Sequence, residues 1–90
     1  MDIIPDTGRQ FAAVVHLNKE AQRTADYVAM RARAARRLGA TAKAYRISAL
    51  ALERHANSAE ERRFGRAVET FRAAAAENWL IADALEVLEI

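Results

Sequence analysis

The sequence has no cysteine, one proline and three glycines among its 90 residues. Without cysteine, disulfide bonds and thiolate metal sites are excluded. No alternating run of β-branched residues bounded by turn dipeptides predicts a strand. No apolar run approaches the roughly 18 residues of a membrane span, and the first residues lack the basic and apolar regions of a secretory signal. We therefore expect an all-α, cytoplasmic protein without membrane association.

Motifs that support catalysis or metal binding are also missing. Neither His16 nor His55 has a glutamate three residues before it, as the helical di-iron sites require. The glycines at 8, 39 and 65 are isolated, so they form no phosphate-binding loop. We expect no enzyme activity, no cofactor and no metal site.

Alanine dominates what is present. Apolar residues make up 52% of the chain, but 22 of the residues are alanine. Since alanine is the best helix former and has a small side chain, the composition predicts one helical domain over residues 1–90, with a thin core and closely approaching helix backbones. Arginine outnumbers lysine 12 to 2, and together with the alanine this bias is typical of a bacterial genome rich in G and C.

Capping signals predict where the first helix lies. Thr7 and Gln10 have the spacing of a capping box, which satisfies free backbone donors at a helix start. Gly39 is a natural residue for the helix end, where Arg36 and Arg37 complement the helix dipole. The first helix is expected over about 8–38.

Two further helices follow after short connections. Thr41 can cap a helix over about 42–56. Ser58 and Glu61 form a second capping box, which predicts a third helix over about 59–89. Short connections favour antiparallel neighbours, so we expect an antiparallel bundle in the order long–short–long.

Both long helices carry heptad patterns, in which apolar residues alternate at spacings of three and four and one asparagine interrupts each seam. The first seam comprises Phe11, Val14, Asn18, Ala21, Ala25, Val28, Ala32 and Ala35. The second comprises Phe64, Ala67, Phe71, Ala74, Asn78, Ile81, Leu85 and Leu88.

The expected helix lengths do not match. A middle helix of about 15 residues covers only half of each long partner, so the N-terminal half of the first helix and the C-terminal half of the third would project. Either these halves pack against a second copy, or the long helices break at Asn18 and Asn78 and fold into four or five helices, since asparagine is a good N-cap.

The first functional hypothesis is a non-catalytic protein–protein interaction or assembly module that self-associates, most simply as a homodimer, through the two long helices. The projecting halves are the most apolar parts of the chain, and large exposed apolar patches mark interaction sites. The predicted interface residues are Phe11, Val15, Trp79, Leu80 and Val87.

The second hypothesis is a nucleic-acid-associated regulator. Residues 31–66 carry ten basic and three acidic side chains, whereas residues 67–90 carry one basic and five acidic ones. The basic middle can therefore attract the acidic tail, within a chain or between copies. It can also bind phosphates, since arginine pairs with them bidentately. The predicted contacts within the basic knob from Arg31 to Arg46 are Arg33, Arg36, Arg37, Lys43 and Arg46.

Overall fold

The computed structural model describes the backbone of residues 3–89 and the side chains of residues 19–89. It consists of α1 (Ile3–Arg37), α2 (Ala42–Glu61) and α3 (Gly65–Glu89), and the described residues contain no strand. The prediction of an all-α fold with three helices is confirmed.

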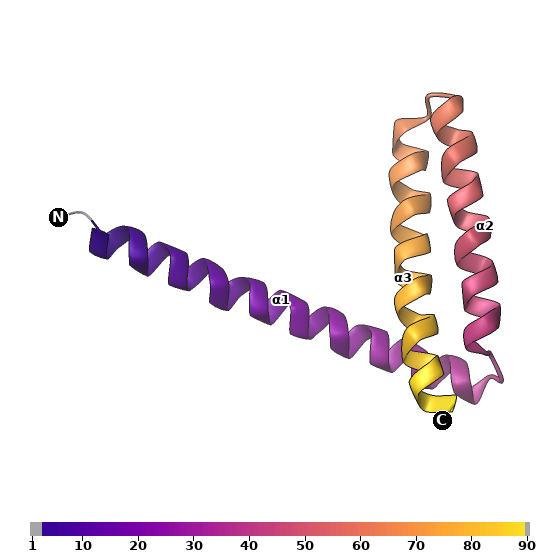
Figure 1. The fold of residues 1–90 in the computed structure, drawn as a ribbon, viewed down its shortest axis with the longest axis horizontal. Helices are drawn as coiled ribbons and strands as arrows, with labels where there is room; N and C mark the ends of the chain where they lie inside the picture. The colour runs from indigo at the N-terminus through magenta and orange to yellow at the C-terminus, as the bar shows by residue number, and fades with distance from the viewer. Residues whose placement is uncertain (1–2, 90) are drawn as a thin grey trace.

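Helices α2 and α3 form a hairpin (Figure 1). Near the connecting turn, Arg72 donates to a carboxylate oxygen of Glu60 over 2.7 Å. At the other end, Glu89 of α3 accepts from the backbone N–H of Ala42, the first residue of α2, over 2.9 Å. The contacts thus connect the end of one helix to the start of the other, so α2 and α3 run antiparallel over their whole length.

Small side chains let α2 and α3 approach closely. The buried residues recur every seven positions along each helix, which is the repeat of a coiled-coil seam. Eight of the eleven buried apolar side chains are alanines. The seam residues are Ala42, Ala49 and Ala56 on α2, and Val68, Ala75 and Ala82 on α3.

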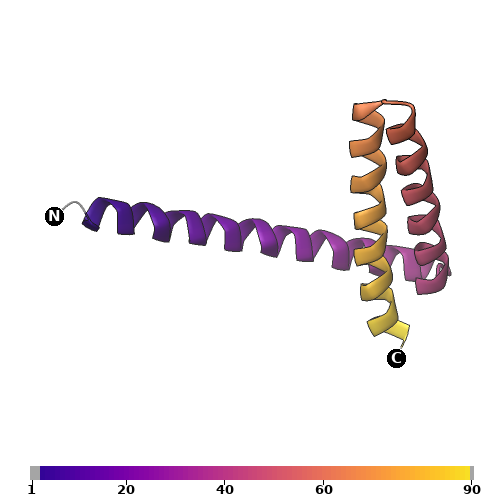
Figure 2. The same ribbon diagram turned by 45° about the horizontal axis from the view of Figure 1, so that its top comes forward.

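Helix α1 packs on α3 and crosses the hairpin near the C-terminus of α3 (Figures 1 and 2). Ala32 and Ala35 of α1 are buried against Ile81 and Leu85 of α3, the two largest fully buried side chains. The rest of α1 extends away from the hairpin. The radius of gyration is therefore 18.0 Å, whereas a compact domain of this length has about 12 Å. The packing contacts support the predicted bundle of three helices, in which α2 and α3 lie side by side and α1 contacts α3 near one end.

The second predicted helix boundary is wrong. The chain stays helical through the Ser58 capping box and ends α2 at Glu61, not at 56, because Ala56 and Ala59 are buried in the hairpin and this packing outweighs a new cap. The turn follows, with Arg63 at φ 63° and the Phe64 N–H donating to the Ala59 carbonyl over 2.9 Å. Helix α3 accordingly begins at Gly65 instead of 59.

The predicted end of the first helix is correct. Gly39 adopts φ 81°, and the Ala40 N–H donates to the Ala35 carbonyl over 3.0 Å, which is the Schellman arrangement. Thr41 caps α2 as expected, since its hydroxyl accepts from the Ala44 N–H over 3.2 Å.

The predicted start of the first helix is too late. Helix α1 begins at Ile3 rather than at 8 and includes Pro5 in its first turn, where a missing N–H leaves no hydrogen bond unmade. The Thr7 capping box therefore lies inside the helix.

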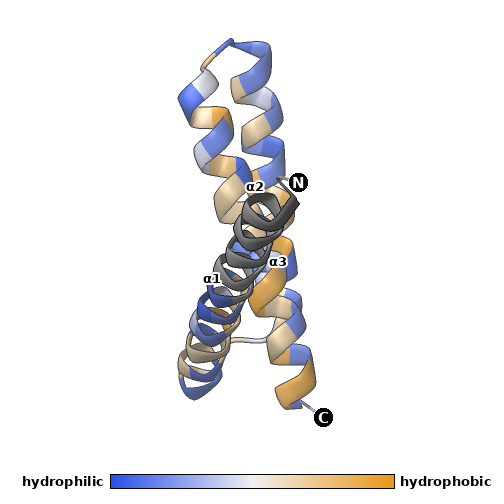
Figure 3. Ribbon diagram, turned by 90° about the vertical axis from the view of Figure 1, so that its left-hand side faces the viewer, coloured by the Kyte–Doolittle hydropathy of each residue, from blue (hydrophilic) through white to orange (hydrophobic). Residues whose placement is uncertain are grey.

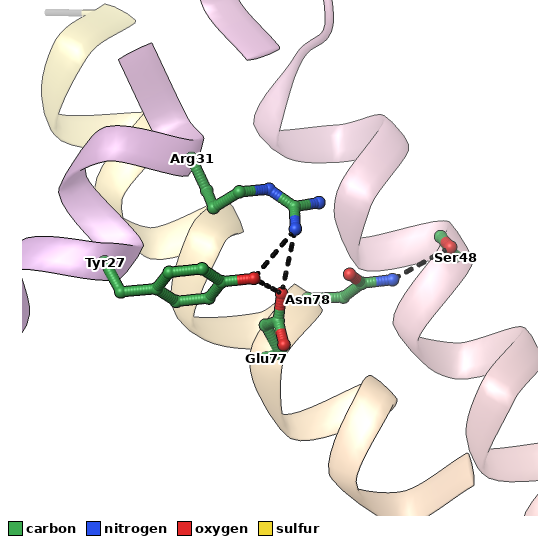
Figure 4. Close-up of polar contacts among 5 residues, drawn as sticks. All are labelled: Tyr27, Arg31, Ser48, Glu77 and Asn78. Atoms are coloured by element: carbon green, nitrogen blue, oxygen red, sulfur yellow. Dashed lines mark hydrogen bonds and ion pairs between the residues drawn. The ribbon is translucent and has the colours of Figure 1, made fainter. Parts of the chain in front are cut away.

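Neither long helix breaks. Helices α1 and α3 continue through Asn18 and Asn78, so the alternative with four or five helices is wrong. The Asn78 amide instead donates to the Ser48 hydroxyl over 3.0 Å (Figure 4). Because α2 has 20 residues, it reaches the C-terminal end of α3. Only α1 projects.

Candidate interaction surface

The projecting part of α1 lacks cover from the rest of the described chain. Every side chain from residue 19 to residue 27 is exposed. Along the predicted seam, Ala21 and Ala25 are exposed, Val28 is half-buried, and Ala32 is fully buried. The heptad pattern thus continues beyond the point where α3 crosses α1, whereas the packing does not.

We refer to the projecting residues 3–27 of α1 as the arm. An apolar hollow lies where the arm meets α3. Its volume is about 480 Å³. Leu80, which is 47% exposed, lies on the α3 side. The lining consists of Ala21, Thr24, Ala25, Val28 and Ala29 of α1, with Leu80 and Ala84 of α3. We refer to this hollow as the corner.

A second apolar hollow adjoins the corner, because Ala29 and Ala84 line both. Its volume is about 310 Å³, and Val87 and Arg33 complete its wall together with Ala32 and Leu88. Val87 is 70% exposed. The hydropathy colouring shows apolar residues over the lower part of α3, whereas the α2–α3 turn is mainly hydrophilic (Figure 3).

A polar cluster connects α1 to α3 close to the point where α1 leaves the hairpin (Figure 4). The Tyr27 hydroxyl donates to Glu77 Oε1 over 3.1 Å, and Arg31 donates to the same hydroxyl over 2.9 Å. Arg31 also pairs with Glu77 over 3.3 Å. The hydrogen bond to Tyr27 is the main reason why the pKa of Arg31 is raised above its ordinary value, and the charge of Glu77 adds to it. The cluster joins one turn of α1 to α3.

The five predicted interface residues lie in different surroundings. Leu80 and Val87 are exposed beside the two apolar hollows. Trp79 is half-buried, and its indole N–H donates to Glu53 of α2 over 2.8 Å. Phe11 and Val15 lie outside the part of the chain whose side chains are described.

Sequence reasoning placed Ala21 and Ala25 in a seam but did not single them out as a surface. It missed Ala29 and Ala84, because neither lies on a predicted heptad seam. Both are half-buried, and their place beside Leu80 becomes visible only through the crossing of α1 and α3.

The structure brings together three of the five predicted basic contacts. Arg33, Arg36 and Arg37 are exposed and line one open hollow of about 380 Å³. Within the described chain, none of the three has an ion-pair partner. Lys43 is exposed but does not line this hollow.

Arg46 is engaged elsewhere. It pairs with Glu86 and, over 3.7 Å, with Asp83 of α3. With the Arg31–Glu77 pair, these contacts show that the basic middle and the acidic tail attract each other within one chain.

Three of the polar side chains that line the groove between α2 and α3 already have partners. The groove measures about 390 Å³, and Glu53, Arg72 and Trp79 contribute to its lining. Glu53 already accepts from Trp79, and Arg72 already pairs with Glu60. Among the described residues there is no group of three or more potential metal ligands. No helix in the described part is both long and apolar enough to span a bilayer.

Comparisons of the sequence with protein-family models and with curated proteins, and of the fold with solved structures, gave no significant match.

Proposed function

We propose that this protein is a non-catalytic helical assembly module that self-associates through α1 and α3. The observation that carries the proposal is the arm: its heptad seam extends past the last residues that α3 covers, and it meets exposed Leu80 at an apolar corner. A bacterial cytoplasm stays a prediction from composition.

Surface area supports association. The chain exposes 7234 Å², whereas a compact protein of 10.0 kDa exposes about 5200 Å². The surplus of about 2000 Å² is more than the roughly 800 Å² that each partner contributes to a standard interface. Most of the stability of helices in proteins comes from packing of an apolar face, and residues 19–27 of α1 lack such packing within the described chain. Association with a second copy would bury part of the surplus surface and would cover the apolar side of the arm.

Light scattering at micromolar concentration tests the proposal. The wild-type chain is expected to have the mass of a dimer or a higher oligomer. Leu80→Asp should shift the mass toward the monomer while helix content, measured by circular dichroism, is retained. Ile47→Asp is the matched control, because Ile47 is also exposed, at 58%, but lies on α2 away from the corner. A wild-type protein that is strictly monomeric refutes the proposal.

A second candidate function is nucleic-acid binding, and the unpaired cluster of Arg33, Arg36 and Arg37 is the observation that favours it. Three phosphate contacts on duplex DNA predict an affinity that falls by roughly 40-fold between 50 and 200 mM salt. Arg36→Glu should abolish binding, whereas Arg54→Glu, at an exposed position on α2, should weaken it little. Absence of DNA or RNA retention at about 50 mM salt excludes this candidate.

A further inference from the structure

We propose that two copies pair through antiparallel α1 arms, so that the first turns of each α1 occupy the corner of the other copy. This inference rests on the proposed self-association and adds its geometry. The occupant of the corner is the segment of a second chain that begins at Ile3. Three properties of the chain favour antiparallel over parallel pairing of the arms. They are the length of the arm, the sizes of its side chains and its charges.

The available length fixes how far two arms can overlap. Pairing must stop near Val28, since beyond it Ala32 and Ala35 are buried. The arm of residues 3–27 is about 37 Å long at 1.5 Å per residue. Two antiparallel arms that overlap fully bring the start of each helix to the end of the partner's arm, which is where the corner lies. A parallel pair would place the two corners opposite each other, with small residues facing small residues, and would bring the two hairpins to the same end.

The two ends of the arm also differ in side-chain size. On the corner side, four of the seven lining residues are alanines, which leaves room for larger side chains. Facing layers fill space best when large residues lie opposite small ones. In the sequence, the large apolar residues fall in the opposite half of the arm, at Ile3, Ile4, Phe11, Val14, Val15 and Leu17.

Charge favours the antiparallel order. Residues 2–10 contain Asp2, Asp6 and Arg9, so their side chains carry a net charge of −1. The other end of α1 carries the unpaired cluster of Arg33, Arg36 and Arg37, and Arg33 lies in the hollow next to the corner. Antiparallel pairing brings the acidic start of one helix toward the basic end of the other, whereas parallel pairing brings the two basic clusters together.

The positions that flank the seam carry no charges that would oppose close contact between two arms. With Asn18 and Ala25 at a positions, the flanking e and g positions of the arm are uncharged. The flanking residues are Gln10, Val15, Leu17, Gln22 and Thr24. The charged side chains of the arm, at 6, 9, 19, 20, 23 and 26, fall at other heptad positions, so neither orientation is blocked by like charges along the seam.

Cross-linking of introduced cysteines distinguishes the orientations, and the absence of native cysteine makes the background clean. Ile4→Cys combined with Leu80→Cys in the full-length chain is treated with a short bismaleimide, since a disulfide would require Cβ atoms within about 4 Å. We expect a covalent dimer whose linked peptides join residue 4 of one chain to residue 80 of the other.

Two controls make the result decisive. Ile4→Cys alone should give little covalent dimer, and Ile4→Cys with Ile47→Cys should give no link between residues 4 and 47. Efficient linkage between the introduced thiols at position 4 of the two chains shows a parallel pair and overturns this inference. Failure of the 4–80 link in a protein whose scattering mass is that of a dimer also overturns it, while leaving self-association intact. A monomeric scattering mass refutes both proposals.

Discussion

Replacing Ala49 by leucine tests the close approach of α2 and α3. Ala49 is fully buried, and the hydrogen bond between Asn78 and the neighbouring Ser48 places Ala49 near Ala75 of α3 in the seam. Leucine adds three carbon atoms where neither helix leaves space. The helices must separate, and the neighbouring layer around Ala56 and Val68 loses contact as well. Overpacking of a tight core costs about 1–3 kcal/mol.

A loss of about 2 kcal/mol lowers the melting temperature of a domain of this size by roughly 8–16 °C. Urea unfolding followed by circular dichroism gives the free energy directly. Ala73→Leu is the control, because Ala73 is an exposed residue of α3 and the same substitution there should change stability by less than about 0.5 kcal/mol. Both variants should be measured at two protein concentrations, since association contributes to apparent stability. Equal stability of the two variants would refute the close packing of the hairpin.

Three further substitutions follow from individual contacts. Arg63→Gly should stabilise the protein by about 0.5–1 kcal/mol, because glycine adopts φ 63° without strain; Arg63→Ala should give no such gain, and an equal gain from alanine would exclude this cause. Trp79→Phe should cost about 0.5–1.5 kcal/mol through the lost hydrogen bond to Glu53, and an unchanged urea midpoint would mean that the bond contributes nothing. Tyr27→Phe should cost about 0.5–1 kcal/mol, since the hydroxyl joins Arg31 to Glu77; in Arg31→Ala, which has already lost the cluster, the same change should cost less.

A helix end was predictable from the sequence where the residue at positive φ is glycine, which is the residue usually found there. Gly39 and Arg63 occupy equivalent positions in two Schellman turns, but only the glycine indicated a helix end. Arginine at a positive φ carries no local signal, because the turn is imposed by the packing of the hairpin around it. The Ser58 box was misleading for the same reason, since burial of Ala59 in α2 determines the outcome.

The heptad seams were predicted in part. Ile81 and Leu85 are fully buried, as the pattern indicated, but Phe64 of the same seam is 57% exposed. With alanine on every face, the phase of the pattern is ambiguous, and the seam through Ala75 and Ala82 was missed. Leu80 and Val87 of the predicted interface are exposed. Their role in association remains a prediction, as does that of Trp79.

The polar cluster of Tyr27, Arg31 and Glu77 acts where α1 leaves the hairpin, about 37 Å from the start of that helix. The direction of the arm therefore depends on contacts at one end of it, which include those of three partly exposed side chains. A rotation of about 10° at the crossing displaces the far end by about 6 Å at this length. Substitutions in this cluster will thus change the spacing between hairpins in any assembly built on α1, and small-angle scattering would detect this change of spacing, which a melting curve does not report.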